Sequence, residues 1–189
     1  MNAMKSGAYP ITLNGEEYGL LFSLNALDEM QERFGGYDKL HEVFNQDNKD
    51  WVKDTRWLFT LLINEARLAE NENAETLSEQ KVGRLINAGN LREIQQAIFA
   101  AFAAGTTGEK ENNNNITEDT EKLDTVRLFY IATVMLRYTE QQAWRKTPYQ
   151  ILTLFKYHKE YNPQIFGYEK PANAGNENMD DIDIALGGF

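Results

Sequence analysis

The pattern of apolar and polar residues at the N-terminal end of the chain predicts a β-hairpin. Two short runs that contain apolar residues, 9–13 and 16–22, flank the dipeptide Asn14-Gly15. A two-residue type I′ turn requires positive φ at both of its positions, and Asn-Gly adopts such angles readily. We therefore expect two short antiparallel strands joined by this turn.

Apolar residues at helical spacing predict a series of helices from there to residue 104. The first begins after Ser23, a favoured N-cap residue, and ends at Gly35-Gly36, because glycine adopts the left-handed conformation that closes a helix. A capping-box pattern, Thr76-Leu77-Ser78-Glu79, predicts a helix that starts there and runs to about residue 88. Helices are also expected over residues 38–45, 50–70 and 91–104.

The composition changes at residues 105–117, which include four consecutive asparagines and almost no apolar side chain. Such a segment gains too little from burial to offset the entropy of ordering, so we expect a flexible linker. Beyond it the pattern predicts a helix over 118–138, a turn at 139–146 and a helix over 147–161, whose start is marked by Thr147-Pro148. Residues 162–189 are expected to be an acidic, flexible tail.

These patterns define the expected fold class and domain organisation. We expect a mainly α protein in which an N-terminal β-hairpin is followed by a helical bundle, a flexible linker and a C-terminal helical hairpin. With 189 residues the chain is long enough for one core but short for two full domains. The expected divisions are 1–104, 105–117, 118–161 and 162–189.

Composition and charge exclude several classes of function. The chain has no cysteine and two histidines, His41 and His158, so thiolate chemistry is ruled out and histidine-based sites lack ligands. We expect no enzyme activity, no cofactor and no metal, and each histidine is interpreted as a surface or packing residue. A net charge of −10 disfavours nucleic acid and anionic membranes as partners. The most apolar run, 128–136, is far shorter than the roughly 20 residues that span a bilayer.

The helix expected around residues 128–138 is apolar on nearly all sides, so burial of one face leaves the rest in water. The surface that covers it is either the N-terminal body of the same chain or another protein. Several cationic residues lie near the ends of the C-terminal helices: Arg137, Arg145, Lys146, Lys156 and Lys159. They form either a solvated face or a binding surface for the acidic tail or for an acidic partner.

The order of these features resembles the tail assembly chaperones of long-tailed bacteriophages. The resemblance runs from NGEEYGLLFSLNALDEMQERFGG near the N-terminus to FYIATVMLRYTEQQAWRKTPYQILTLFKYHKEY, and covers most of the chain up to about residue 161. Its most characteristic part is the turn Trp144-Arg145-Lys146-Thr147-Pro148 before a leucine-rich helix, although the family commonly has methionine where this chain has Lys146. These motifs are structural and imply no catalytic residue.

The resemblance implies a non-catalytic protein of the host cytoplasm that binds and solubilises the tape measure protein, helps to recruit tail tube subunits and is absent from the mature virion. It also implies self-association, and often a short and a frameshift-extended form, with residues 105–116 as the natural junction here; a single unbroken reading frame remains the alternative. A structural or connector subunit retained in the virion is the competing interpretation. Candidate residues for partner binding, or for the local core, are Phe129, Tyr130, Trp144, Arg145 and Phe155.

Overall fold

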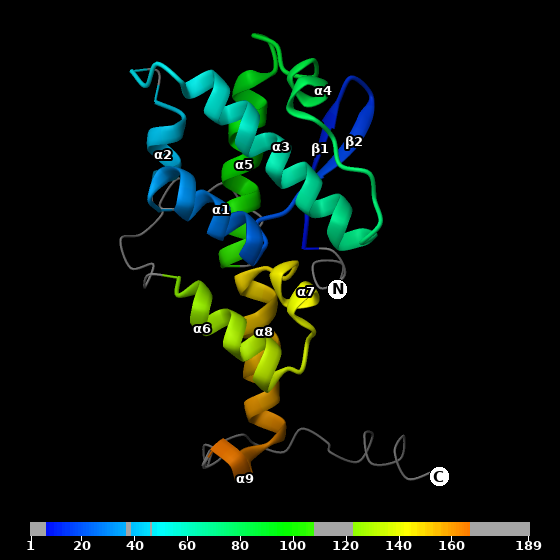
Figure 1. Cartoon of the computed structure of the whole chain (residues 1–189), viewed down its shortest axis with the longest axis vertical. Helices are drawn as coiled ribbons and strands as arrows, with labels where there is room; N and C mark the ends of the chain where they lie inside the picture. Colours follow the sequence, from blue (N-terminus) through cyan, green and yellow to red (C-terminus); the bar gives the residue numbers. More distant parts are fainter. Residues whose placement is uncertain (1–6, 37–38, 46, 108–122, 167–189) are drawn as a thin grey trace, which may run out of the picture. The chain divides into compact units, whose positions relative to one another are not determined.

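A computed structural model describes residues 7–36, 39–45, 47–107 and 123–166. The chain divides into two compact units, residues 1–155 and 156–189. The described residues are mainly helical, with a two-stranded antiparallel hairpin at the N-terminal end (Figure 1). The expected fold class is therefore confirmed.

The hairpin consists of β1 (Tyr9–Leu13) and β2 (Glu16–Leu20), paired so that Tyr9 lies opposite Leu20. Asn14 and Gly15 have φ angles of 53° and 83°, as a type I′ turn requires. Strand β2 ends two residues earlier than expected. The N–H of Leu21 donates instead to the carbonyl of Leu62 in α3, which leads the chain away from β1.

The body contains α1 (Leu24–Phe34), α2 (Leu40–Val43), α3 (Trp51–Glu70), α4 (Glu79–Gly83) and α5 (Leu91–Thr106). Helix α1 has the expected caps: the Ser23 hydroxyl accepts from Ala26 N–H, and Gly35 adopts a left-handed conformation with φ of 80°. Helix α4 corrects the sequence prediction. Its N-cap is Ser78 and not Thr76, and it ends at Gly83 rather than near residue 88.

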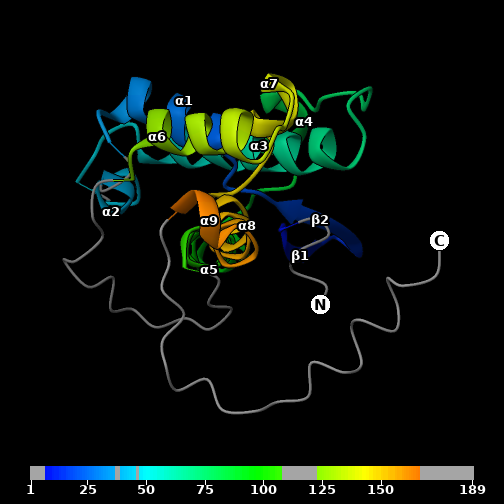
Figure 2. The same cartoon turned by 90° about the horizontal axis from the view of Figure 1, so that it is seen from below.

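The main core lies between the hairpin and the body helices. Figure 2 shows α1 and α3 in one layer and the hairpin and α5 in the other. The largest fully buried side chains include Phe22 and Phe59, and Phe22 meets Phe102 of α5 edge-to-face at 5.3 Å between ring centroids. A Cβ at Gly105 would lie 3.1 Å from the Phe22 Cβ, so glycine allows this close approach. Helix α5 thus continues past Ala104, where the linker was expected to begin, and residues 108–117 of that linker lie outside the described residues.

The C-terminal part of the first unit differs from a simple helical hairpin. It contains α6 (Thr125–Tyr130), the π-helical turn η3 (Ile131–Met135), α7 (Glu140–Trp144) and the start of α8 (Pro148–Tyr161). The turn expected over 139–146 holds α7, whose N-terminus has a capping box between Thr139 and Gln142. A second capping box, between Thr147 and Gln150, precedes α8 as expected.

The two capping boxes offer a matched test of burial. Thr147 is buried and Thr139 is exposed, although both hydroxyls accept the same N3 hydrogen bond at 3.2 Å. Thr147→Ala is expected to lower the free energy of unfolding by about 2 kcal/mol and Thr139→Ala by about 0.5 kcal/mol, because water replaces the lost hydroxyl only at the exposed site. Urea unfolding of both variants checks the difference, and equal losses would contradict it.

In the second unit the structure describes residues 156–166. Helix α8, which crosses the boundary between the units, ends at Tyr161, and α9 (Pro163–Phe166) follows. The Asn162 side chain donates to the His158 carbonyl at 2.7 Å, and the His158 ring lies 5.7 Å from the Phe166 ring. The first residues of the predicted tail thus form a short helix, whereas residues 167–189 lie outside the description.

Candidate partner-binding surface

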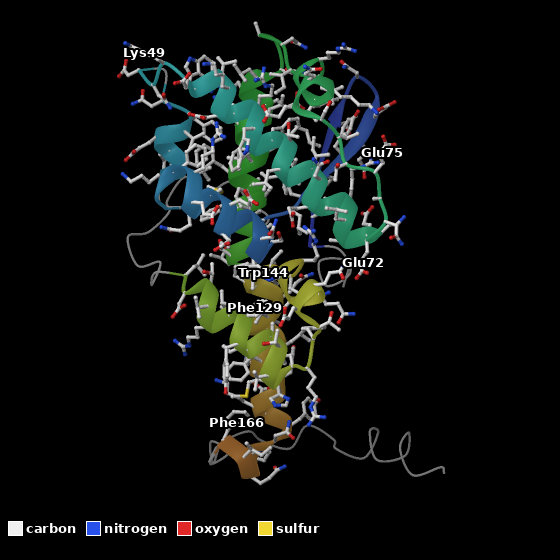
Figure 3. The ribbon with its side chains drawn as sticks, in the orientation of Figure 1. Lys49, Glu72, Glu75, Phe129, Trp144 and Phe166 are labelled. Atoms are coloured by element: carbon white, nitrogen blue, oxygen red, sulfur yellow. The ribbon has the colours of Figure 1, made fainter. Side chains whose placement is uncertain are left out.

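A second, smaller cluster of apolar side chains joins α1 to α6, η3, α7 and α8 within the first unit. Phe129 of α6 and Trp144 of α7 pack against this cluster, and their rings lie 4.8 Å apart between centroids with planes tilted by 35° (Figure 3). Phe155 is also partly buried against this cluster. Its buried members are Leu24, Leu128, Ile131, Ala132, Ala143 and Ile151.

Leu24 connects this cluster to the body. Its side chain is fully buried among residues of the C-terminal segment, although Leu24 itself is the first residue of α1. Its N–H, one of the donors that a helix N-terminus leaves unpaired, donates to the carbonyl of Lys146 at 2.9 Å. The body therefore contributes both an apolar anchor and a backbone donor to the segment 123–155.

A buried carboxylate forms the second connection between these parts. Glu65 of α3 is 2% exposed and accepts hydrogen bonds from the Ser23 hydroxyl at 2.6 Å and the Asn25 amide at 2.9 Å. The Arg145 guanidinium completes the set with an ion pair to the same carboxylate. A charge buried this deeply requires such partners, because desolvation of an unpaired carboxylate is costly. Arg145 is thus a structural cation and not a free one.

These contacts place the five predicted residues in different settings. Phe129, Trp144 and Phe155 belong to the second cluster and keep only part of their surface in water. Arg145 is paired with Glu65. Tyr130 alone among the five is largely solvent-exposed, at 53%.

Tyr130 lies in an exposed apolar stripe with two residues that the sequence analysis did not select. Val126 is 78% exposed and Val134 is 54% exposed, and the three residues are spaced four apart on α6 and η3. The spacing was visible in the sequence. Which side of this almost wholly apolar helix faces water was not visible, because that depends on where the body packs.

The π-helical turn keeps the stripe straight. A step of four residues overshoots the ~3.6 residues of an α turn, so Tyr130 is rotated past Val126. The four residues from Tyr130 to Val134 make less than one full turn of a π-helix, in which each hydrogen bond joins residues five apart. One such bond runs from the Leu136 N–H to the Ile131 carbonyl at 2.9 Å. The two rotations have opposite signs, so Val134 returns into line with Val126.

The stripe carries few charges. Between Asp124 and Glu140, the only side chains that are charged at neutral pH are those of Arg127 and Arg137, and both are exposed. Asp124 caps α6 by accepting from the Arg127 N–H at 2.9 Å, and Arg137 follows η3 with a φ of 59°. The stripe therefore has both an acid and a base, Asp124 and Arg127, at its N-terminal end and a base, Arg137, beyond its C-terminal end.

Two pairs of side chains outside this surface have shifted pKa values. A hydrogen bond from Lys53 lowers the pKa of Asp50 and raises that of Lys53, and a hydrogen bond to Glu16 raises the pKa of Tyr18. These are surface pairs. Within the described residues, no three histidine, aspartate or glutamate side chains gather closely enough to hold a metal ion.

A small hollow lies between the hairpin and α3. Its volume is about 260 Å³, below the usual range of ligand pockets, and its lining mixes Glu17, Arg67 and Glu70 with the small residues Ala8 and Gly19. Arg67 is already engaged, since its side chain donates to the Glu75 carbonyl. The exposed stripe is therefore the stronger candidate for a functional surface.

No family model, curated protein or solved structure matches this chain significantly. Over the described part of the chain, the structure contains no helix that is both long and apolar enough to cross a bilayer.

Proposed function

We propose that this protein is a non-catalytic tail assembly chaperone of a long-tailed bacteriophage, acting in the host cytoplasm and absent from the mature virion. It binds and solubilises the tape measure protein and helps to recruit tail tube subunits. The observation that supports this role best is the exposed stripe of Val126, Tyr130 and Val134, which is held on a segment fixed to the body.

The stripe suits an extended helical client. Three apolar side chains along one face of a helix pack against the apolar face of another helix, in the way that amphipathic helices are commonly recognised. One such contact is small and weak. Many copies bound side by side along one long client gain from high effective concentration, so that occupancy does not require a tight single site.

The stripe also predicts which substitutions abolish capture. A Tyr130→Glu/Val134→Glu variant is expected to recover less than about one tenth of the wild-type amount of tape measure protein after co-expression and affinity capture. Burial of an unpaired carboxylate costs more than the about 1.4 kcal/mol that corresponds to a tenfold change in affinity. Val52→Glu is the matched control, because Val52 of α3 is 49% exposed and lies outside the stripe.

The wild-type experiment decides the proposal itself. A tape measure protein that becomes soluble and co-purifies with the wild-type chain supports the chaperone role. Circular dichroism must show that both variants are folded before their capture is compared with that of the wild type. A tape measure protein that precipitates unbound contradicts it. Detection of the chain in purified virions by mass spectrometry would instead favour a structural or connector subunit.

A further inference from the structure

We propose that Arg127 and Arg137 make the exposed stripe selective for helices whose apolar face is bordered by carboxylates. The inference rests on the proposed chaperone function, and it names the class of client segment that the stripe takes: an amphipathic helix with Asp or Glu beside its apolar residues. Helices with Lys or Arg in those places are rejected.

The stripe belongs to a basic part of an acidic chain. The whole chain has a net charge of −10, whereas residues 125–138 contain two arginines and no Asp or Glu. Successive residues of a helix are rotated by about 100°, so Arg127 lies beside the line from Val126 to Tyr130. Asp124 lies two residues before Val126, on the side of the helix away from the stripe, and its carboxylate accepts from the Arg127 N–H. The charge next to the stripe is therefore positive.

These two arginines are also available to a partner. Other cations of the same segment are engaged: Arg145 is held by a buried carboxylate, and the Lys146 ammonium lies 5.3 Å from the centroid of the Tyr138 ring. Arg127 and Arg137 are exposed, and neither forms an ion pair within the part of the chain that the structure describes. Both can therefore pair with carboxylates of a bound helix without breaking a contact of the fold.

The charges act on selectivity more than on strength. A single exposed ion pair adds little affinity, because water and salt screen it. A helix with basic flanks, in contrast, would bring like charges together at each contact, and such repulsion discriminates between partners. Repetition of the contact along a long client multiplies the small difference at each site.

Two synthetic helical peptides test the selectivity of the full chain. They share leucines at every fourth residue and differ only in whether Glu or Lys borders the leucines, and both are immobilised at high density so that weak contacts add up. At low salt, the wild-type chain should be retained about tenfold more on the Glu peptide, because both pairs change from attractive to repulsive on the Lys peptide. Nonspecific attraction cannot produce this result, since the net charge of −10 favours the Lys peptide.

Charge reversal assigns the preference to the two arginines. Arg127→Glu/Arg137→Glu should prefer the Lys peptide, and the neutral variant Arg127→Gln/Arg137→Gln should lose the preference without reversing it. The matched control is Arg84→Glu/Arg92→Glu, which changes the net charge equally at exposed sites of the body and should keep the preference of the wild type. Thermal melts confirm that each variant is folded.

Each outcome decides the proposal. Equal retention on the two peptides, stronger retention on the Lys peptide, or a control that also reverses its preference overturns it. Retention on neither peptide, with a dimer seen in analytical ultracentrifugation, would make a second copy the occupant of the stripe and overturns it too. Capture of the tape measure protein without a peptide preference would leave the chaperone function standing and refute the selectivity, whereas a peptide preference without such capture would do the reverse.

Discussion

Arg145→Met is expected to lower the free energy of unfolding by about 3 kcal/mol. Methionine keeps much of the apolar stem of arginine but removes the cation that faces Glu65, which is 2% exposed. Ser23 and Asn25 still donate to that carboxylate, but neither carries a positive charge. Breaking a buried ion pair from one side typically costs about 3–5 kcal/mol, because the remaining charge stays desolvated. The two remaining donors place this variant at the lower end of that range.

Urea unfolding at neutral pH measures this loss. Lys53→Met is the control, since Lys53 pairs with Asp50 on the surface, where both side chains are more than half exposed and water screens the two charges, so its loss should change stability little. Equal, small losses in the two variants would show that Arg145 is not needed to balance Glu65. An Arg145→Met variant that keeps its stability but loses client capture would return Arg145 to the group of partner-binding residues.

Leu24→Ala is expected to cost about 3 kcal/mol and to loosen the segment 123–155. Leu24 has no exposed surface, and truncation of a buried leucine leaves a cavity that the surroundings fill only in part. The cavity would open between α1 and the second cluster, which also contains Leu128, Ile131 and Ile151. The cost therefore falls on the contact between body and segment.

Hydrogen exchange followed by mass spectrometry locates the effect. Amides of α6 and η3 should lose more protection in Leu24→Ala than amides of α3, because the opening that exposes them becomes easier. Leu152→Ala is the control, since Leu152 lies in α8 and is 44% exposed. Unchanged protection of α6 would mean that Leu24 does not hold the segment in place.

Local signals predicted those elements whose cause is local. The hairpin follows from the φ preferences of Asn14-Gly15, and the start of α8 follows from a box whose members are three residues apart. Helix α7 was missed, although Thr139 and Gln142 have the same spacing and the same reciprocal hydrogen bonds. The cap of α4 was placed at Thr76 because Glu79 follows it at the spacing of a capping box. The N-cap is Ser78, whose third following residue is Lys81, so the local pattern favoured the wrong hydroxyl.

The surface was less predictable because it depends on distant residues. Arg145 and Glu65 are 80 positions apart, and no local pattern indicates that the one neutralises the other. Phe129 and Trp144 were selected as candidates for partner contact or for the local core, and the sequence left open which of the two they serve; the structure places both partly buried against the second cluster. The choice among Tyr130, Val126 and their neighbours required the packed helix, since the whole segment is apolar.

The anchoring of the C-terminal segment by Leu24 and Glu65 affects how a shortened chain would behave. A chain that stopped near Thr107 would keep the hairpin and the main core, but it would expose Leu24 to solvent and leave the Glu65 carboxylate without its cation. Such a product would present a new apolar and acidic acceptor site at the start of α1. A short form and a full-length form of this protein would thus differ in the surface they offer, and not only in length.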